Sequence, residues 1–408
     1  MPRVLRIINR FNLGGPTHNA AYLTRFLPPE YETLLVGGAQ EATEEGSGHI
    51  LQALGVQPMI LPEMQREVAP WRDRTAYRRI KQLIRDFRPD IVHTHAAKAG
   101  AVGRLAAKEM GVKAIVHTFH GHVFHSYFGH VRTTLYKNIE RFLARRSDRI
   151  VAISEKQKQE LVHEHRICPA DKVAVIPLGF DLSRFQQEQA AKRAMFRRVY
   201  GVADDEVAVG IVGRLVPVKN HDLFLQAFRQ VREAAPGRIR AFIVGDGEER
   251  ERLEGLTDQL GLSRAHGPYF NGHGFGHGVH GHPAVERADV TFTSWVKEID
   301  IVNAGVDIVA LTSHNEGTPV SLIEAQASST PVVSTRVGGI ENVVAHGRTG
   351  LLSPPDDVDA FASNLLKLVQ DRGLRHELAL HGWDHVRERY HYTRLVNDTA
   401  RLYAELLS

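Results

Sequence analysis

The sequence predicts an α/β protein made of two Rossmann-like domains, each with a doubly wound parallel sheet. Short β-rich runs alternate with segments of helical spacing along most of the 408 residues. The alternation is interrupted in the segment 173–185 by Pro177 and Gly179, and it restarts at residue 206. A chain of this length can also form two separate hydrophobic cores.

The first half contains βαβ units typical of a parallel sheet. A segment of helical spacing, 17–27, follows the first β-rich run, and helical segments or loops separate the later ones. The β-rich runs lie at 4–9, 32–38, 90–96, 113–119 and 148–154.

The second half repeats the pattern and then becomes helical, with no further strand from about Ala360 to Ser408. Its β-rich runs lie at 206–215, 239–247, 289–295, 306–313 and 331–339. The predicted domains are 1–180, 181–385 with an insertion at 265–284, and a helix over 386–408 that crosses back to the first domain. In such a protein, ligands are expected in a central cleft that faces the carboxyl ends of both sheets.

Composition narrows the class of protein. The chain has 43% hydrophobic and 24% charged residues, which are ordinary values for a soluble globular protein. A single cysteine, Cys168, excludes an intrachain disulfide and favours a reducing compartment. No apolar run approaches the length of a transmembrane helix, so we expect a cytoplasmic protein.

Residues 266–282 form a low-complexity segment with five histidines and repeated glycines. We interpret it as a flexible surface insertion. Its G-x-G-x-x-G string, 276–281, neither follows a strand nor opens a helix, so it does not indicate a dinucleotide site. Histidines at this spacing can chelate a metal ion, but ordering a glycine-rich chain costs much entropy, and no metal site is expected here.

The most informative motif follows the apolar run 306–313. Thr318 suits a helix N-cap and Pro319 the first helical position, which would leave the backbone N–H groups of Val320 and Ser321 free for a phosphate. Glu316 precedes this helix, and Glu324 lies eight residues further on, so the two carboxylates could contact opposite ends of a nucleotide-sugar. The alternative is one acidic residue favoured by the helix dipole and one solvated glutamate.

A second motif follows the run 206–215. Gly213 and Arg214 end the strand, and Lys219 comes five residues later. Two cations on one loop at the carboxyl end of a strand are suited to neutralise a diphosphate leaving group. The alternative is a solvated loop.

Two motifs in the first half could also reach the cleft. Gly14 and Gly15 allow close approach of the backbone to a ligand at the first strand-to-helix turn, which could equally be an ordinary tight turn. His120, before Gly121, ends a histidine-rich strand. Most histidines in that segment are expected to be structural.

Together these motifs resemble family 4 of the retaining glycosyltransferases, which have the GT-B fold. The resemblance rests on Gly213-Arg214 with Lys219, on Gly245-Asp246-Gly247, on Glu316 and Glu324 as an E-x7-E motif, and on the segment 330–341. It spans nearly the whole chain, since the Gly-Gly turn lies at the front and the segment 176–181 at the domain linker.

The resemblance implies a donor site and its chemistry. Arg214 and Lys219 would bind the donor diphosphate, Glu324 the ribose, and Glu316 the transferred sugar. As catalytic residues it implies Glu316, Arg214, Lys219 and His120. As donor-binding residues it implies Gly14, Gly15, Gly213, Arg214, Lys219, Ser294, Trp295, Glu316, Gly317, Thr318, Pro319, Val320 and Glu324. The family needs no metal or other cofactor, and the Asp357-x-Asp359 pair is expected to cap the following helix.

The sequence departs from the family pattern at two places. Ser294 before Trp295 stands where the family usually has glycine near the nucleotide base, so contacts to the base are in doubt. Leu178 replaces the usual asparagine of the linker.

The charge distribution suggests an anionic partner for the first half. Residues 1–185 contain 27 Lys and Arg against 18 Asp and Glu, whereas the remainder has 24 against 29. Two basic segments, 74–88 and 132–149, have helical apolar spacing that could lie on an anionic membrane, although any surface helix is amphipathic. No nucleic-acid-binding motif is present, so nucleic acid is not expected as a partner.

We therefore expect a retaining glycosyltransferase that acts in cell-surface polysaccharide or glycoconjugate synthesis. Its donor would be a nucleotide-diphosphate sugar, with UDP as the carrier by family frequency, and its acceptor a glycan or polyprenyl-linked acceptor at the inner face of the membrane. Two alternatives stay open. One is a non-hydrolysing nucleotide-sugar epimerase, and the other is a non-catalytic carbohydrate- or nucleotide-binding protein of the same fold.

Overall fold

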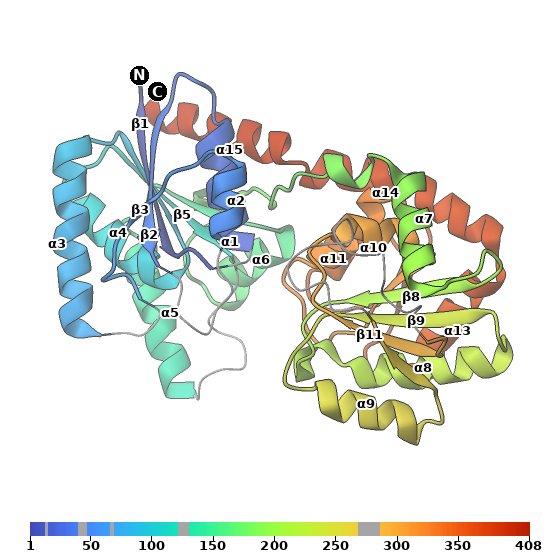
Figure 1. Ribbon diagram of the computed structural model, residues 1–408. Helices are drawn as coiled ribbons and strands as arrows, with labels where there is room; N and C mark the ends of the chain where they lie inside the picture. The colour runs from blue at the N-terminus through green and yellow to red at the C-terminus, as the bar shows by residue number, and fades with distance from the viewer. Residues whose placement is uncertain (13–14, 40–46, 66–68, 121–129, 268–285) are drawn as a thin grey trace. The chain divides into compact units, whose positions relative to one another are not determined.

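The computed structural model describes residues 1–12, 15–39, 47–65, 69–120, 130–267 and 286–408 (Figure 1). The chain divides into two compact units. Unit 1 comprises Met1–Phe180 and Arg389–Ser408, and unit 2 comprises Asp181–Glu388. The chain therefore passes from one unit to the other twice.

Unit 1 is built on a parallel sheet, which has seven strands in the part of the chain described. The order of its strands is β3-β2-β1-β4-β5-β6-β7. They are β1 (Arg3–Arg10), β2 (Glu32–Gly38), β3 (Met59–Ile60), β4 (Ile91–His95), β5 (Ala114–Phe119), β6 (Arg149–Ala152) and β7 (Val173–Val175). β1 pairs with β2 on one side and with β4 on the other, so the strand order reverses direction between β1 and β4.

Helices cover both faces of this sheet because successive strand residues point to opposite faces. Val4 packs with the helices α1 and α15, whereas Leu5 packs with α3 and α4. The helices of unit 1 are α1 (Gly15–Phe26), α2 (Gly48–Ala53), α3 (Pro70–Phe87), α4 (Ala97–Glu109), α5 (His130–Ala144), α6 (Glu155–Gln159) and α15 (Tyr392–Leu407). The helix near the C-terminus thus completes a core that begins with the first strand.

Unit 2 contains a second parallel sheet with seven strands among the described residues, in the order β10-β11-β9-β8-β12-β13-β14. They are β8 (Val207–Val212), β9 (Ile239–Val244), β10 (Arg264–His266), β11 (Val290–Ser294), β12 (Ile308–Leu311), β13 (Val332–Thr335) and β14 (Gly350–Ser353). Here the order reverses between β8 and β12, which pair directly.

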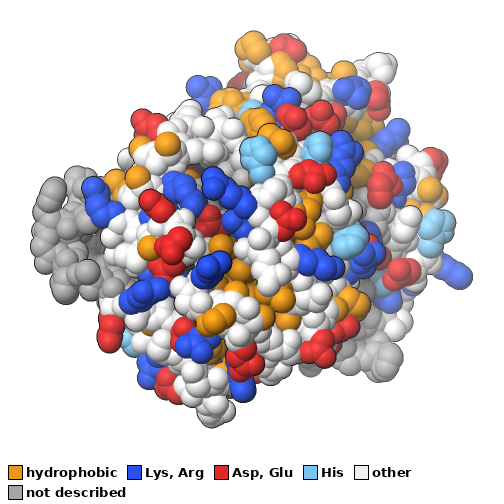
Figure 2. Space-filling model, turned by 90° about the vertical axis from the view of Figure 1, so that its right-hand side faces the viewer, with side chains coloured by type: hydrophobic (Ala, Val, Ile, Leu, Met, Phe, Trp, Pro, Cys, Tyr) orange, Lys and Arg blue, Asp and Glu red, His pale blue; other side chains and the backbone are white. Residues whose placement is uncertain are grey.

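The core of unit 2 packs α8, α9 and α13 against the sheet through fully buried side chains such as Phe224, Phe228 and Phe361. Its helices are α7 (Gln189–Tyr200), α8 (His221–Ala234), α9 (Arg250–Gln259), α10 (Ile299–Gly305), α11 (Val320–Ala327), α12 (Ile340–Val343), α13 (Val358–Gln370) and α14 (Arg372–Tyr390). On the face of the molecule drawn in Figure 2, acidic and basic side chains are interspersed.

The predicted fold class is confirmed, and so is the helical character of the last fifty residues. Several details differ from the predictions. Four short strands, β3, β7, β10 and β14, lie outside the predicted β-rich runs. Residues 265 and 266 belong to β10, which pairs with β11, rather than to the insertion. The basic helix α5 ends at Ala144, and Arg149 begins β6. The return to unit 1 begins at Arg389 rather than at residue 386.

The remaining part of the predicted insertion, 268–285, lies outside the described residues. Asp357 caps α13 by accepting a hydrogen bond from the backbone N–H of Ala360 at 2.9 Å, as expected for this acidic pair. Among the helices described, none has the length and apolarity needed to cross a membrane.

Candidate functional site

The strand order of unit 2 brings two predicted catalytic residues together. Lys219 follows β8 and Glu316 follows β12, at the carboxyl ends of neighbouring strands. The Nζ of Lys219 donates to Oε1 of Glu316 at 2.6 Å, and the hydroxyl of Ser313 donates to the same oxygen at 2.6 Å. The pair thus lies where the strand order reverses, which is the usual ligand-binding position in open α/β sheets.

The backbone holds the two loops of this pair against each other. The hydroxyl of Thr312, just after β12, donates to the backbone oxygens of Lys219 and Asn220 at 3.1 and 2.8 Å. The N–H of His314 donates to the oxygen of Val218 at 2.9 Å. Because the contacts are made by the Thr312 hydroxyl and the main chain, the positions of Lys219 and Glu316 depend little on their own side chains.

Glycines allow a third loop, after β13, to approach Glu316 closely. The N–H of Gly339 donates to the oxygen of Glu316 at 2.8 Å. A Cβ on Gly338 would lie 2.0 Å from the oxygen of Glu316, and one on Gly339 would lie 1.7 Å from the oxygen of Gly317. A side chain at either glycine would displace the loop that carries Glu316. The segment 330–341 therefore supports the site mainly through its backbone.

The loop after β8 makes a similar backbone contact with the loop after β9. The N–H of Gly213 donates to the oxygen of Val244, and a Cβ on Gly245 would lie 1.9 Å from the oxygen of Gly213. Gly245 also has a φ of 141°, which disfavours other residues. Arg214 is exposed in this loop, and its side chain makes no hydrogen bond or ion pair within the described part of the chain. Its guanidinium is therefore available to a ligand.

The start of α11 differs slightly from the prediction. The N-cap is Pro319 rather than Thr318, no side chain caps the helix, and the first helical residue is Val320. The helix therefore begins one residue later than expected. Gly317 is exposed beside Glu316, and a Cβ there would contact nothing within 4 Å.

Glu324 lies on α11, where its side chain is 19% exposed. Burial raises the pKa of Glu324 to about 7, and the charge of Asp300 also raises it, while Arg184 lowers it. The Nη2 of Arg184 lies 3.9 Å from Oε1 of Glu324. The carboxyl group thus has one cation nearby and few other polar contacts, which leaves acceptor capacity for the hydroxyls of a ligand.

Ser294 and Trp295 lie at the carboxyl end of β11. The hydroxyl of Ser294 donates to Oδ2 of Asp246 at 2.7 Å, and Arg250 donates to the same oxygen at 3.1 Å. Burial acts to raise the pKa of Asp246, but the hydrogen bonds from Ser294 and Gly247 and the charge of Arg250 outweigh it, so the pKa is lowered. Trp295 is 54% exposed, which leaves its ring free to stack on a planar group.

In unit 1, the predicted residue His120 follows β5 and contacts a second histidine at the end of β4. The Nδ1 of His95 and the Nε2 of His120 lie 2.9 Å apart, and their rings stack. Burial lowers the pKa of His120 to about 3. The Nε2 of His95 and the Nδ1 of His120 have no hydrogen-bond partner within the described residues. Both rings are therefore uncharged near neutral pH.

His93 continues this histidine stack into the core. Its Nδ1 lies 2.5 Å from the hydroxyl of Tyr403 on α15, and its Nε2 lies 2.7 Å from the hydroxyl of Thr118. The hydroxyl of Tyr403 accepts from the fully buried Arg6 at 3.1 Å. That hydroxyl can then donate to Nδ1 of His93, an arrangement in which Nε2 of His93 carries the proton and donates to Thr118.

Of the predicted Gly-Gly turn, Gly14 lies outside the described residues. Gly15 is the first residue of α1, and a Cβ there would lie 3.3 Å from Cδ1 of Leu178, the linker residue that departs from the family pattern.

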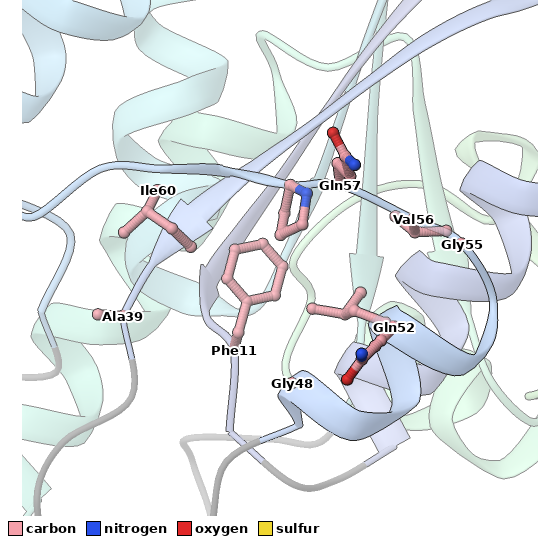
Figure 3. A pocket seen from close by; sticks show the side chains of 10 residues that line it. Phe11, Ala39, Gly48, Gln52, Gly55, Val56, Gln57 and Ile60 are labelled. Atoms are coloured by element: carbon pink, nitrogen blue, oxygen red, sulfur yellow. The ribbon is translucent and has the colours of Figure 1, made fainter.

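A pocket of about 630 Å³ opens in unit 1 near the carboxyl ends of β1 and β2 (Figure 3). Its lining consists of Phe11, Ala39, Gly48, Leu51, Gln52, Gly55, Val56, Gln57, Pro58 and Ile60. None of these residues carries a charge, so their side chains supply no cation to a ligand.

Metal ligands do not gather in the described residues: no group of three or more His, Cys, Asp or Glu side chains there could hold an ion. His266 instead lies 3.1 Å from Oε1 of Glu254.

Several residues of these sites were not singled out from the sequence. Ser313 and Asp246 lie inside motifs in which only the glycines and glutamates were given a role. Both residues come directly after or near the end of a strand, and this position could have indicated that they belong to the site. His95 stands at the end of a β-rich run, which is the same signal that indicated His120. No sequence pattern relates Arg184 to Glu324, because 140 residues separate them.

Known proteins resemble this chain along most of its length. Residues 14–184 match the family described as Glycosyltransferase Family 4, and residues 206–371 match the family described as Glycosyl transferases group 1. A UDP-Gal:α-D-GlcNAc-diphosphoundecaprenol α-1,3-galactosyltransferase from Escherichia coli is 27% identical over 322 residues, which cover 78% of this chain and 76% of that protein. A D-inositol 3-phosphate glycosyltransferase from Actinosynnema mirum is 30% identical over 309 residues, which cover 73% and 68%.

A solved structure has the same fold. Anabaena HepE in complex with UDP gives a TM-score of 0.79 at 19% identity, with 99% of this chain and 100% of that chain covered. Two Rossmann-like units with this strand order define a GT-B protein. The chain belongs to the family 4 glycosyltransferases, as its motifs indicated, and it is a glycosyltransferase.

Proposed function

We propose that this glycosyltransferase uses a UDP-sugar and transfers the sugar with retention of its anomeric configuration. The acceptor that we propose is a lipid-linked glycan. Among the relatives, the Escherichia coli galactosyltransferase is named for a UDP-sugar donor and a diphosphoundecaprenol-linked acceptor, and the Anabaena structure contains UDP.

One observation carries the donor site: the Lys219 to Glu316 ion pair at the strand reversal of unit 2. Lys219 is 22% and Glu316 10% exposed, so both side chains are largely protected from water yet still reachable. Arg214, exposed on the same loop as Lys219, supplies a second cation. A diphosphate carries the charge that two such cations can stabilise.

The proposed reaction places charge stabilisation at the centre of catalysis. As the bond between the sugar C1 and the diphosphate oxygen breaks, Lys219 and Arg214 stabilise the negative charge that develops on the diphosphate. The acceptor hydroxyl forms the new bond to C1 on the same face and passes its proton to the departing phosphate oxygen. Glu316 positions the sugar, and Glu324 accepts hydrogen bonds from the ribose.

The other proposed contacts follow from position. The amides at Gly317, Thr318 and Val320 lie at the start of α11 beside Glu316, where they can donate to the sugar or its phosphate. Trp295 is proposed to stack on the base and Ser294 to line that position. For His120 we propose a contact with the transferred sugar, which its neutral ring can make by donating or accepting a hydrogen bond.

Ligand-induced stabilisation tests the donor assignment. Thermal unfolding of the full chain is measured with UDP, GDP, ADP and common nucleotide-sugars, each with and without EDTA. A ligand present at about 100 times its Kd adds about 2.7 kcal/mol to the apparent free energy of unfolding. We expect UDP and one UDP-sugar to stabilise the chain and EDTA to change nothing.

A matched pair of variants tests the site. Lys219→Met is expected to lower kcat/KM for the UDP-sugar by about 100-fold, since one charge-stabilising donor is typically worth that much. Arg232→Met removes another ion pair of unit 2, the contact of Arg232 with Asp289 at 2.8 Å. Asp289 precedes β11 and therefore lies at the amino ends of the strands, away from Lys219. This variant should therefore retain activity. Equal losses in both variants would contradict the proposed site.

Product analysis tests the reaction itself. NMR of the product should show the anomeric configuration of the donor sugar. Conversion of the donor into another nucleotide-sugar without any acceptor would indicate an epimerase instead.

A further inference from the structure

Helix α5 of unit 1 leaves a row of large apolar side chains in solvent. Leu135, Ile139 and Phe142 are 57%, 38% and 45% exposed. They stand four and three residues apart, so they share one face of the helix. On the other side of α5, Glu140 and Ala144 are buried. The helix thus has a packed face and a second apolar face that nothing in the described part of the chain covers.

Basic residues border this row. The guanidinium of Arg146 lies 3.5 Å from the centre of the Phe142 ring, and Arg145 is exposed one residue earlier. From residue 130 to 146 the sequence has a single acidic residue, Glu140. Its carboxylate is buried and accepts from Arg104 at 2.7 Å, so it adds no negative charge to the surface.

A second basic helix lies on the same side of the sheet. The cores place α3 and α4 against one face, and Phe119 of that face packs with Ala144 of α5. Helix α3 packs against α4, and α4 contacts α5. At its N-terminal end, α3 carries Trp71, which is 80% exposed. Its exposed arginines are Arg72, Arg74, Arg78, Arg79 and Arg85.

The two basic helices differ in what they do with their apolar residues. In α3, Ile80, Leu83 and Ile84 are buried against the sheet, as in any surface helix. In α5, packing does not account for the row Leu135, Ile139 and Phe142. This row therefore suits an apolar partner, and its arginine border suits an anionic one.

We propose that α5 docks unit 1 onto an anionic lipid bilayer, with Leu135, Ile139 and Phe142 inserted among the acyl chains and Arg145 and Arg146 at the headgroups. Trp71 and the arginines of α3 contact the same surface. Two features favour a bilayer over a protein partner: the exposed charged residues of α3 and of the end of α5 are arginines apart from Asp86, and a helix with an apolar row and basic flanks is the form that lies in a membrane interface. The inference rests on the proposed function, since a lipid-linked acceptor requires access to a membrane.

Vesicle binding tests this proposal. The full chain is sedimented with vesicles of phosphatidylcholine alone and of phosphatidylcholine mixed with phosphatidylglycerol. We expect binding to the mixed vesicles that weakens as salt is added, because salt screens the arginines. The triple variant Leu135→Ser, Ile139→Ser, Phe142→Ser should lose about tenfold or more of this binding, and Arg145→Glu with Arg146→Glu should lose the preference for the anionic lipid.

A matched control comes from unit 2. Leu380 on α14 is 61% exposed, so Leu380→Ser removes a similarly exposed apolar side chain from another surface. This variant should bind vesicles as the unaltered chain does. Circular dichroism and UDP-induced stabilisation should be unchanged in the triple variant, which shows that the fold and the donor site are retained.

Other outcomes would overturn the proposal. If the unaltered chain ignores anionic vesicles, or if the triple variant binds them equally well, α5 is not the docking helix. If gel filtration shows a dimer that the triple variant abolishes, the apolar row is an interface between copies of the chain. Vesicle binding without any sugar transfer would instead contradict the proposed function and leave the docking helix standing.

Discussion

The two units present opposite chemistry at the same position of similar sheets. In unit 2, the loops at the strand reversal carry the charged pair of Lys219 and Glu316, with the exposed Arg214 beside them. In unit 1, the strands at the reversal carry His93 and His95, whose rings are buried and stacked 4.4 Å apart. The loops of unit 2 thus carry charged side chains at this position, whereas the strand β4 of unit 1 carries buried histidines.

The difference arises from what surrounds each set of side chains. The ion pair of unit 2 lies on loops that follow the strands, where Lys219 and Glu316 contact each other at 2.6 Å. The histidines of unit 1 lie on the strands themselves, where burial lowers the pKa values of His93, His95 and His117 well below 6.5. Burial within the sheet thus accounts for the uncharged histidines of unit 1.

Acidic pH should destabilise unit 1 more than unit 2. A histidine with a lowered pKa in the folded state binds no proton there, whereas the unfolded chain binds one below about pH 6.5, so stability falls as the pH decreases. We expect about 1 kcal/mol of lost stability per pH unit for each of His93, His95, His117 and His120. Hydrogen exchange followed by peptide at pH 7.5 and 5.5, corrected for intrinsic rates, should show unit 1 opening first. Equal loss of protection in both units would contradict the conclusion that the histidines of unit 1 are buried and uncharged.

Two glycine variants should sharpen the description of the charged site. Gly339→Ala places a Cβ 1.7 Å from the oxygen of Gly317, so the loops must separate. We expect a loss of about 1–3 kcal/mol in stability and a loss of activity as Glu316 shifts. Gly317→Ala places its Cβ in open space and should retain stability. Thermal unfolding measures both, and similar melting temperatures for the two variants would rule out the tight backbone contact.

Glu324 offers an exception within unit 2, since burial raises its pKa to about 7. The folded chain keeps this proton between about pH 4.5 and 7 while the unfolded chain releases it, so the stabilisation is lost as the pH rises through that range. Glu324→Gln should remove this pH dependence and gain about 1–2 kcal/mol relative to the unaltered chain between pH 5 and pH 8. Denaturant unfolding at the two pH values measures it. UDP should bind more weakly to the variant, because the ribose hydroxyls lose the carboxylate that is proposed to accept their hydrogen bonds.

The smallest effect is expected at Ser294. Ser294→Ala removes the hydrogen bond to Asp246 while the backbone, which has a φ of 60° at this residue, is equally strained by either side chain. The loss should be about 1 kcal/mol, measured by denaturant unfolding, and the pKa of Asp246 should rise. Ser263→Ala is the matched control. It removes the hydroxyl that donates to Asp289 at 2.8 Å at the amino ends of the strands, and it should leave UDP binding unchanged.

The sequence predicted the architecture well because strands and turns leave local signals. Alternating apolar runs located both sheets, and the loops after β8 and β12, which carry Arg214, Lys219 and Glu316, were expected beside a ligand. The spatial partners were not predictable in this way. The contact of Lys219 with Glu316 joins residues 97 positions apart, and the contact of His93 with Tyr403 joins residues 310 positions apart. Only the strand order, which the sequence does not display, brings them together.

Helix α5 illustrates a second limit. The spacing of its apolar residues resembles that of α3, and both sequences predict basic amphipathic helices. Whether an apolar face meets the sheet or the solvent depends on how the helix rotates as it packs, and that rotation leaves no local pattern. The same limit applies to the N-cap of α11, where one residue separates the predicted start from the observed one.

The discontinuous composition of unit 1 also affects how the protein is made. Unit 2 is a single stretch of chain and has all its residues once Glu388 has been synthesised. Unit 1 starts first, yet Arg6 and His93 obtain their buried partner, Tyr403, only when α15 leaves the ribosome. The unit that is translated first is therefore completed last, and until then its histidine strands lack the helix that encloses them.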